Sequence, residues 1–275
     1  MHSQNWHNLQ YLPSLTVANA GDIIPSWEKR SAASRTQHPF IADIAYGPHQ
    51  REVIDLFRVP NAKATLIYIH GGYWRMLSKV ETSFVVDGFL EQGVTVALIN
   101  YPLCPEVSIG EIRTSIQKAF TYLYKNILTE DERKSIVVTG HSAGGHLAAL
   151  HLATDWKIFG LPEDPMAGVI SLSGVFDVAP LMHTNLNDVL RITETSAAIL
   201  NLNSALIRSK AKLVFAVGGD EPSEFHRQSS DQAKAWASLN PKIITLPGTN
   251  HFTIVDSLAT AGGVLNTLAQ TMFST

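Results

Sequence analysis

The sequence contains little cysteine and little charge. Cys104 is the one cysteine among 275 residues, so an internal disulfide cannot form and a disulfide scaffold is excluded. Charged residues make up 16% and hydrophobic residues 45% of the chain, a balance that excludes a disordered protein. The chain also lacks an apolar run near the roughly 18 residues that a membrane-spanning helix needs. We therefore expect a globular protein with a large core and no membrane partner.

Basic clusters and cofactor motifs are missing too. The 21 Lys and Arg residues stand against 24 Asp and Glu, and no basic cluster stands out, which argues against nucleic acid as a partner. Phosphate-cradling and dinucleotide-binding glycine patterns are absent, and His141, His146 and His151 lack the spacing of metal ligands. We expect no cofactor and no metal. The first seven residues have no basic or apolar signal region, so the expected location is the cytoplasm.

Short apolar runs alternate with helix-like stretches along most of the chain. The runs lack polar alternation, as is typical of strands covered on both faces; they are residues 64–69, 94–99, 135–139, 169–172, 213–217 and 243–246. The helix-like stretches are residues 80–92, 109–126, 143–154, 230–239 and 257–273. This order predicts an α/β fold with a mostly parallel central sheet and helices on both faces.

Two segments depart from this alternation. Residues 1–40 precede an expected antiparallel strand pair, 41–46 and 52–59, joined by a Gly-Pro turn. Residues 175–208 are longer than a simple crossover, and their apolar spacing predicts helices. We expect a single domain over residues 1–275, with the first segment as an N-terminal cap and the second as a lid over the carboxyl edge of the sheet.

The sharpest motif is Gly-His-Ser-Ala-Gly at residues 140–144, between an apolar strand-like run and a helix-like stretch rich in Ala and Leu. A serine on such a tight turn projects its hydroxyl above the sheet, and the flanking glycines let neighbouring backbone pass closely. The helix N-terminus also favours developing negative charge. Ser142 is therefore the expected nucleophile, and a glycine-rich turn without a catalytic role is the alternative.

A second glycine-rich motif, His-Gly-Gly-Tyr-Trp at residues 70–74, directly follows an expected strand. Acyl transfer needs hydrogen-bond donors aimed at the oxyanion that forms when a carbonyl is attacked, and backbone N–H groups in such a loop supply them. Hydrolases with a serine elbow place this loop upstream of the serine. We expect Gly72, Tyr73 and Ala143 to donate their N–H groups. Gly71 completes the expected oxyanion hole by supplying the turn.

The serine needs a histidine as base and a carboxylate that orients this histidine. The chain order for this architecture is serine, acid, histidine. His251 follows the last expected strand and precedes the last expected helix, and we assign it as the base. His226 is the alternative base, but it lies in a polar helix-like stretch.

The acid follows the expected strand 213–217, where Asp220 and Glu221 are adjacent. Neighbouring side chains on a loop usually point apart, so we expect one of them to reach the imidazole. In many hydrolases of this layout the acid comes three residues after the first loop glycine and directly precedes proline. That resemblance favours Glu221, and Asp220 stays the alternative acid.

Together the motifs resemble the α/β-hydrolase superfamily. Within it, the sequence is most similar to kynurenine formamidases (arylformamidases), relatives of the hormone-sensitive-lipase-like esterases. The distinguishing detail is Tyr-Trp at 73–74, where esterases of the wider group more often have a third glycine. Further agreement lies in Tyr-Gly at 46–47, Ile-Asp-Leu-Phe at 54–57, Tyr-Pro-Leu-Cys-Pro at 101–105 and Glu-Phe-His-Arg-Gln-Ser at 224–229. The likeness spans about residue 40 to the C-terminus.

The resemblance implies an α/β-hydrolase fold and a small-molecule substrate, with Ser142 as nucleophile, His251 as base and the acid at the Asp220/Glu221 position. Formamidases commonly carry aspartate there, so Glu221 departs from the family pattern. The implied reaction is cleavage of an aryl formamide such as N-formyl-L-kynurenine through an acyl-enzyme. Dimers are common in such folds, and a homodimer is expected without an indicated interface.

Three aromatic residues flank the expected site. The rings of Tyr73, Trp74 and Phe252 are expected to bind substrate in a pocket that suits an aromatic formamide, with packing of the loop as the alternative, most of all for Trp74. A carboxylesterase for small acyl esters is the alternative activity, because the triad chemistry does not distinguish an ester from an activated amide. A catalytically inactive binding protein is a further alternative, but serine, histidine and acid are all present.

Overall fold

The computed structural model describes residues 2–273, whose strands form one sheet of eight. The strands are β1 (Ile41–Ala45), β2 (Val53–Phe57), β3 (Thr65–Ile69), β4 (Thr95–Ile99), β5 (Ile136–His141), β6 (Gly168–Leu172), β7 (Lys212–Gly218) and β8 (Lys242–Leu246). Their order is β1-β2-β4-β3-β5-β6-β7-β8. Strand β2 is antiparallel to both its neighbours, and the other pairs are parallel. The expected mostly parallel sheet is therefore confirmed.

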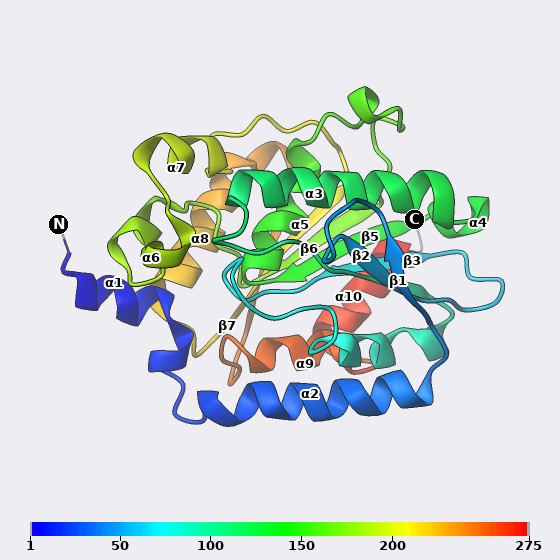
Figure 1. The fold of residues 1–275 in the computed structure, drawn as a ribbon, viewed down its shortest axis with the longest axis horizontal. Helices are drawn as coiled ribbons and strands as arrows, with labels where there is room; N and C mark the ends of the chain where they lie inside the picture. The colour runs from blue at the N-terminus through cyan, green and yellow to red at the C-terminus, as the bar shows by residue number, and fades with distance from the viewer. Residues whose placement is uncertain (1, 274–275) are drawn as a thin grey trace.

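Helices cover both faces of this sheet (Figure 1). One face carries α3 (Ile109–Tyr122), α5 (Ala143–Ala153) and α8 (Ser223–Ala235), and the other carries α2 (Ala20–Gln37), α9 (Asp256–Ala259) and α10 (Val264–Phe273). Because successive side chains of a strand point to opposite faces, Ile67 and Ile69 of β3 join the core beneath α3 and α5. Leu66 and Tyr68 join the core beneath α2, α9 and α10. Both faces are buried, which explains the uninterrupted apolar runs of the strands.

Two expected helices take a different form. Residues 80–92 contain the short 3₁₀ helices Ser83–Gly88 and Leu90–Gln92, in a stretch where β-branched valines lower the helix propensity. The stretch 257–273 is divided into α9 and α10. Between them, Gly262 has a φ of +79°, a left-handed conformation that ends helices and that glycine adopts readily.

The two segments outside the alternation are helical. Before β1 the chain forms α1 (Gln4–Tyr11) and α2, and the segment after β6 contains a 3₁₀ turn (Ala179–His183), α6 (Asn187–Leu190) and α7 (Glu194–Leu200). Helix α1 packs against that 3₁₀ turn and α8, whereas α2 crosses the opposite face beside residues 83–88 (Figure 1). The N-terminal segment therefore passes from one side of the sheet to the other around its carboxyl edge.

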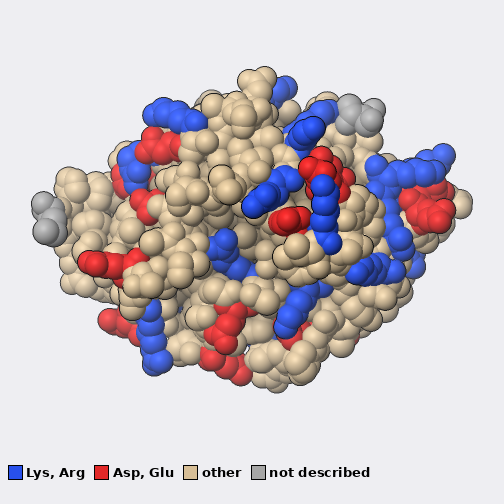
Figure 2. Space-filling view, turned by 90° about the horizontal axis from the view of Figure 1, so that it is seen from above, with Lys and Arg blue, Asp and Glu red and all other residues tan. Residues whose placement is uncertain are grey.

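The surface carries both signs of charge. Basic and acidic side chains are interspersed over the face seen in Figure 2, and neither forms a continuous patch there. Within residues 2–273, no helix combines the length and the apolarity that crossing a bilayer requires.

Candidate active site

Ser142 lies between β5 and α5, at the carboxyl edge of the sheet. Its backbone has φ 56° and ψ −120°, a region that residues with a side chain rarely adopt. The N–H of Ser142 donates to the carbonyl of Leu172 at 2.8 Å, which ties the turn to the end of β6. The strained turn expected from the sequence is therefore present, and Ser142 is also one of the residues that line a pocket.

The glycines of this turn are required by close backbone contacts. A Cβ on Gly140 would lie 2.2 Å from the carbonyl oxygen of Gly144, and a Cβ on Gly144 would lie 2.1 Å from that of Ile69. Neither contact can be relieved by rotating a side chain, because both atoms belong to backbone of the central sheet and its helix.

We therefore expect Gly144→Ala to lower the free energy of unfolding by about 1–3 kcal/mol, the usual cost of overpacking a core. Urea unfolding followed by circular dichroism measures this. Gly110→Ala is the matched control, since its Cβ would have only Ser108 Oγ near it, at 3.8 Å, and alanine is the better helix former. Equal stability of the two variants would contradict the packing argument.

His251 and Glu221 form a buried pair. Nδ1 of His251 lies 2.7 Å from Oε2 of Glu221, and the two residues are 3% and 7% exposed. The other carboxylate oxygen, Oε1, accepts hydrogen bonds from the N–H of Gly218 at 2.6 Å and from Ser173 Oγ at 2.5 Å. Both oxygens of Glu221 thus have partners, as a buried carboxylate requires.

The alternative residues lie elsewhere. Asp220 is exposed; its backbone N–H donates to the carbonyl of Thr249 at 3.0 Å, and within residues 2–273 its carboxylate makes no hydrogen bond. His226 lies on α8 and does not line the pocket of Ser142. The structure therefore brings Glu221 to His251 and leaves Asp220 and His226 outside the site.

Ser173 is a contributor that the sequence analysis missed. It follows β6, is fully buried and has a φ of 49°. The signal that could have found it is its position, because β6 and β7 are neighbours whose carboxyl ends meet at one edge. A polar side chain just after β6 is thereby placed within reach of an acid just after β7.

Ser142 and His251 line the same pocket. Among the hydrogen bonds that residues 2–273 make, none joins Ser142 Oγ to the imidazole of His251. Such contacts are often loose without substrate and tighten in the complex. The geometry therefore places the serine beside a histidine that is already oriented, and the serine hydroxyl remains free to turn.

His141 holds the loop of His251. Its Nε2 lies 2.6 Å from the carbonyl oxygen of His251, and the two rings are 4.7 Å apart. Burial, together with the nearby charge that His251 can carry, lowers the pKa of His141 well below its usual value. The ring is therefore neutral, and because a carbonyl only accepts, Nε2 must carry the proton. His141 thus fixes the backbone of the histidine loop.

The loop at residues 70–74 forms a tight turn. Gly72, Tyr73 and Trp74 all have positive φ, at 98°, 48° and 56°, and the carbonyl of Gly72 accepts from the N–H groups of Arg75 and Met76 at 3.0 and 3.1 Å. This turn leaves the N–H groups of Gly72 and Tyr73 unused within residues 2–273. The N–H of Ala143 at the start of α5 is likewise unused there, so the three expected donors have no protein acceptor in that range.

Gly71 has a different role from the one expected. Rather than making the turn, which begins at Gly72, it allows close approach of the loop to the serine elbow. A Cβ on Gly71 would lie 2.8 Å from the carbonyl oxygen of His141 and 3.2 Å from Cβ of Ser142. The small residue sets the distance between the loop and the serine.

The pocket beside Ser142 has a volume of about 150 Å³ and is mainly apolar. Two of the expected substrate-binding residues, Tyr73 and Phe252, line it. Trp74 does not: its side chain is fully buried and stands edge-on to His146, with ring centroids 5.5 Å apart. The structure therefore favours the packing alternative for Trp74.

The N-terminal segment, expected to be a cap, supplies a wall of this pocket, and no local sequence signal indicated which of its residues do so. Its lining residues are Leu12, Pro13, Ser14, Ala20, Ile24 and Trp27. The segment 175–208 contributes Leu186.

Tyr11 ties that wall to the rest of the site. Its carbonyl accepts a hydrogen bond from the Tyr73 hydroxyl, and its own hydroxyl donates to Glu224 of α8. Burial, reinforced by Glu224, raises the pKa of the Tyr11 phenol above its usual value. The residue that precedes the pocket wall is therefore anchored to the expected oxyanion loop and to α8 at once.

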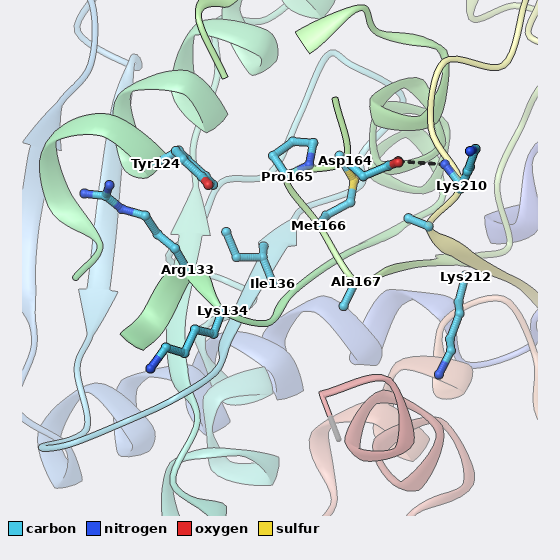
Figure 3. Close-up of a pocket in the computed structure, with 11 residues that line it drawn as sticks. Tyr124, Arg133, Lys134, Ile136, Asp164, Pro165, Met166, Ala167, Lys210 and Lys212 are labelled. Carbon is cyan, nitrogen blue, oxygen red and sulfur yellow. Dashed lines mark hydrogen bonds between the residues drawn. The ribbon is translucent and has the colours of Figure 1, made fainter. Parts of the chain in front are cut away.

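A cavity of about 410 Å³ lies at the opposite edge of the sheet, where β5 and β7 begin (Figure 3). Basic residues line it, but the side chains of Arg133, Lys134 and Lys212 point away from one another. Asp164 accepts from the backbone N–H of Lys210 at 2.7 Å. Among the described residues that line this cavity, none is a nucleophile with an adjacent base. In residues 2–273, no group of three His, Cys, Asp or Glu side chains could hold a metal ion.

Comparison with known proteins places this site in context. The family model BD-FAE matches residues 54–214. A kynurenine formamidase from Salmo salar is 32% identical over 235 residues, which cover 79% of this chain and 76% of the relative. A kynurenine formamidase from Danio rerio is 28% identical and covers 94% of this chain and 93% of the relative.

Solved structures share the fold. A crystal structure from Silicibacter sp. tm1040, provisionally assigned as a thioesterase, superposes with a TM-score of 0.86 at 29% identity, over 94% of this chain and 97% of that one. Esterase B from Lactobacillus rhamnosis superposes with a TM-score of 0.66 at 16% identity, over 92% and 94% of the two chains. The expected hydrolase fold is thereby confirmed.

Proposed function

The chain belongs to the kynurenine formamidase family of α/β-hydrolases, and from this premise we propose that it hydrolyses an aryl formamide such as N-formyl-L-kynurenine to the free arylamine and formate. The observation that carries the proposal is the hydrogen bond between Glu221 and His251, because His251 lines the same pocket as Ser142. The relatives from Salmo salar and Danio rerio support the choice of a formamide.

We propose that acylation proceeds from Ser142. Its Oγ attacks the formyl carbon while Nε2 of His251 accepts the hydroxyl proton, which is possible because Nδ1 of the same ring is engaged by Glu221 at 2.7 Å. The carbonyl oxygen becomes an oxyanion, which the N–H groups of Gly72, Tyr73 and Ala143 would bind. The negative carboxylate stabilises the imidazolium that has formed.

The tetrahedral intermediate then collapses. The C–N bond breaks, His251 returns its proton to the arylamine, and the formyl group stays on Ser142 as an ester. Water next attacks this ester, with His251 again as base, and a second collapse releases formate and restores the serine hydroxyl. Each step thus uses one proton site, Nε2 of His251.

The pocket supports a small acyl group and a flat leaving group. A formyl group is the smallest acyl group, and the mainly apolar cavity of about 150 Å³ suits it beside an aromatic ring. Tyr73 and Phe252 offer aromatic surfaces for this ring. We also propose that residues 1–40 cap the site and that residues 175–208 form its lid, since both segments contribute lining residues.

The rate on N-formyl-L-kynurenine, measured beside p-nitrophenyl acetate, tests the proposed function. We expect a formamide kcat/KM of about 10⁴ M⁻¹s⁻¹ or more, within the normal range of enzymes. Serine-dependent ester cleavage without formamide turnover would replace the formamidase by a carboxylesterase, the related activity of the structural neighbours. Absence of both would favour a binding protein.

A cytoplasmic location and a homodimer are further proposals. The first is supported by a fold that needs no disulfide, with Cys104 buried. The second is supported by the position of β8 at one edge of the sheet, because an edge strand can pair with another chain.

A further inference from the structure

One charged side chain at the pocket has no role in the reaction described above. Arg75 lines the cavity together with Ser142 and His251. It is exposed, and within residues 2–273 its guanidinium makes no hydrogen bond and no ion pair. Arg51, by contrast, donates to the carbonyls of Tyr101 and Leu77. Unlike Arg51, Arg75 therefore makes no side-chain hydrogen bond that would hold the backbone of the described residues together.

The lining of the pocket has no negative charge that compensates the charge of Arg75. The described residues that line the pocket include no Asp, Glu or Lys, and Arg75 is the one permanently charged group among them. A guanidinium at the mouth of an apolar cavity binds planar anions well, because two parallel N–H groups match the two oxygens of a carboxylate. The pocket is therefore complementary to a ligand with an apolar body and one acidic group.

The backbone fixes Arg75 relative to the reacting atoms. Its N–H donates to the carbonyl of Gly72 at 3.0 Å, so Arg75 closes the same turn that presents the N–H groups of Gly72 and Tyr73. A substrate held with its carbonyl oxygen at those N–H groups therefore lies beside the backbone from which the Arg75 side chain extends.

We propose that Arg75 binds the carboxylate of the substrate and makes the enzyme selective for aryl formamides that carry a free acid over neutral formamides and esters. This inference rests on the proposed function and adds the substrate class. N-formyl-L-kynurenine has such an acid on its amino-acid arm. The contact is made at the rim, so it acts mainly on binding.

Two formamides test the selectivity. N-formyl-L-kynurenine is compared with 2′-formamidoacetophenone, which keeps the aryl formamide and the ketone but lacks the amino-acid arm. In Arg75→Gln we expect the ratio of kcat/KM for the acid to that for the neutral compound to fall about 10-fold or more, largely through KM. Arg75→Lys should retain part of the ratio. Arg208→Gln is the control, because Arg208 is exposed and lies outside this pocket.

Product binding gives a second readout that does not depend on turnover. By calorimetry, we expect L-kynurenine to bind Arg75→Gln about 10-fold more weakly than the parent protein, with a smaller change for 2-aminoacetophenone. If formamides are cleaved but neither the ratio nor the Kd depends on Arg75, the inference fails and the formamidase stands. If no formamide is cleaved but L-kynurenine binding depends on Arg75, the formamidase fails and the acid site stands. If L-kynurenine does not bind and no ratio changes, the inference is overturned.

Discussion

Replacing Ser142 by alanine is expected to lower kcat on the best substrate about 10⁶-fold, the scale seen when a hydrolase loses its nucleophile. Without the hydroxyl no acyl-enzyme can form, and His251 and the backbone donors can only assist direct attack by water. The residual rate should lie about 10³- to 10⁴-fold above the uncatalysed reaction. Steady-state kinetics on N-formyl-L-kynurenine measure the loss, and a thermal melt shows whether the variant is folded.

Covalent labelling provides the control for this prediction. A fluorophosphonate should add its mass to Ser142 of the parent protein, because this hydroxyl lines the same pocket as the oriented His251. The label should be absent from Ser142→Ala and present in Ser14→Ala, since Ser14 also lines the pocket but does not lie at the strand-to-helix turn. A folded Ser142→Ala variant with parental turnover would refute the assignment of the nucleophile.

The parts of the site that could be predicted are those fixed by local chain geometry. The serine elbow at residues 140–144 and the turn at residues 70–74 need glycine at defined positions, and such backbone requirements are visible in a sequence. The alternation of strands and helices could likewise be predicted, because strands that are buried on both faces appear in the sequence as short apolar runs. Fold class and enzyme family are confirmed, whereas the individual catalytic roles stay proposals until they are measured.

The parts that could not be predicted depend on contacts between distant segments. The hydroxyl of Tyr73 donates a hydrogen bond to the carbonyl of Tyr11, and this bond holds the N-terminal segment at the site. Neither residue has a sequence feature that indicates the contact. Ser173 reaches Glu221 across two neighbouring strands. The position of Trp74 beside His146 could not be predicted either, because it depends on how the loop at residues 70–74 packs onto α5. Local periodicity carries no information about such pairs.

Glu221→Gln is expected to lower kcat about 10⁴-fold, the scale of the corresponding acid-to-amide change in serine proteases. The reason lies in the contacts of Oε1. The N–H of Gly218, fixed in the backbone, donates to this atom at 2.6 Å, so in the variant the amide oxygen must occupy that position. The amide nitrogen then faces Nδ1 of His251. Nδ1 must accept, the proton moves to Nε2, and the imidazole can no longer take the proton of Ser142.

Two further variants show whether the loss of activity comes from the wrong tautomer of His251, from the position of the negative charge or from the neighbouring acid Asp220. Glu221→Asp keeps the charge but draws the carboxylate back by one methylene, out of the 2.7 Å contact with Nδ1, and we expect an intermediate loss. Asp220→Asn should change kcat/KM by less than about twofold, because Asp220 is exposed and outside the site. The same assay with thermal melts measures all three. A larger loss for Asp220→Asn than for Glu221→Gln would mean that the loop rearranges to present Asp220, and the aspartate pattern of the formamidases would then hold for this enzyme as well.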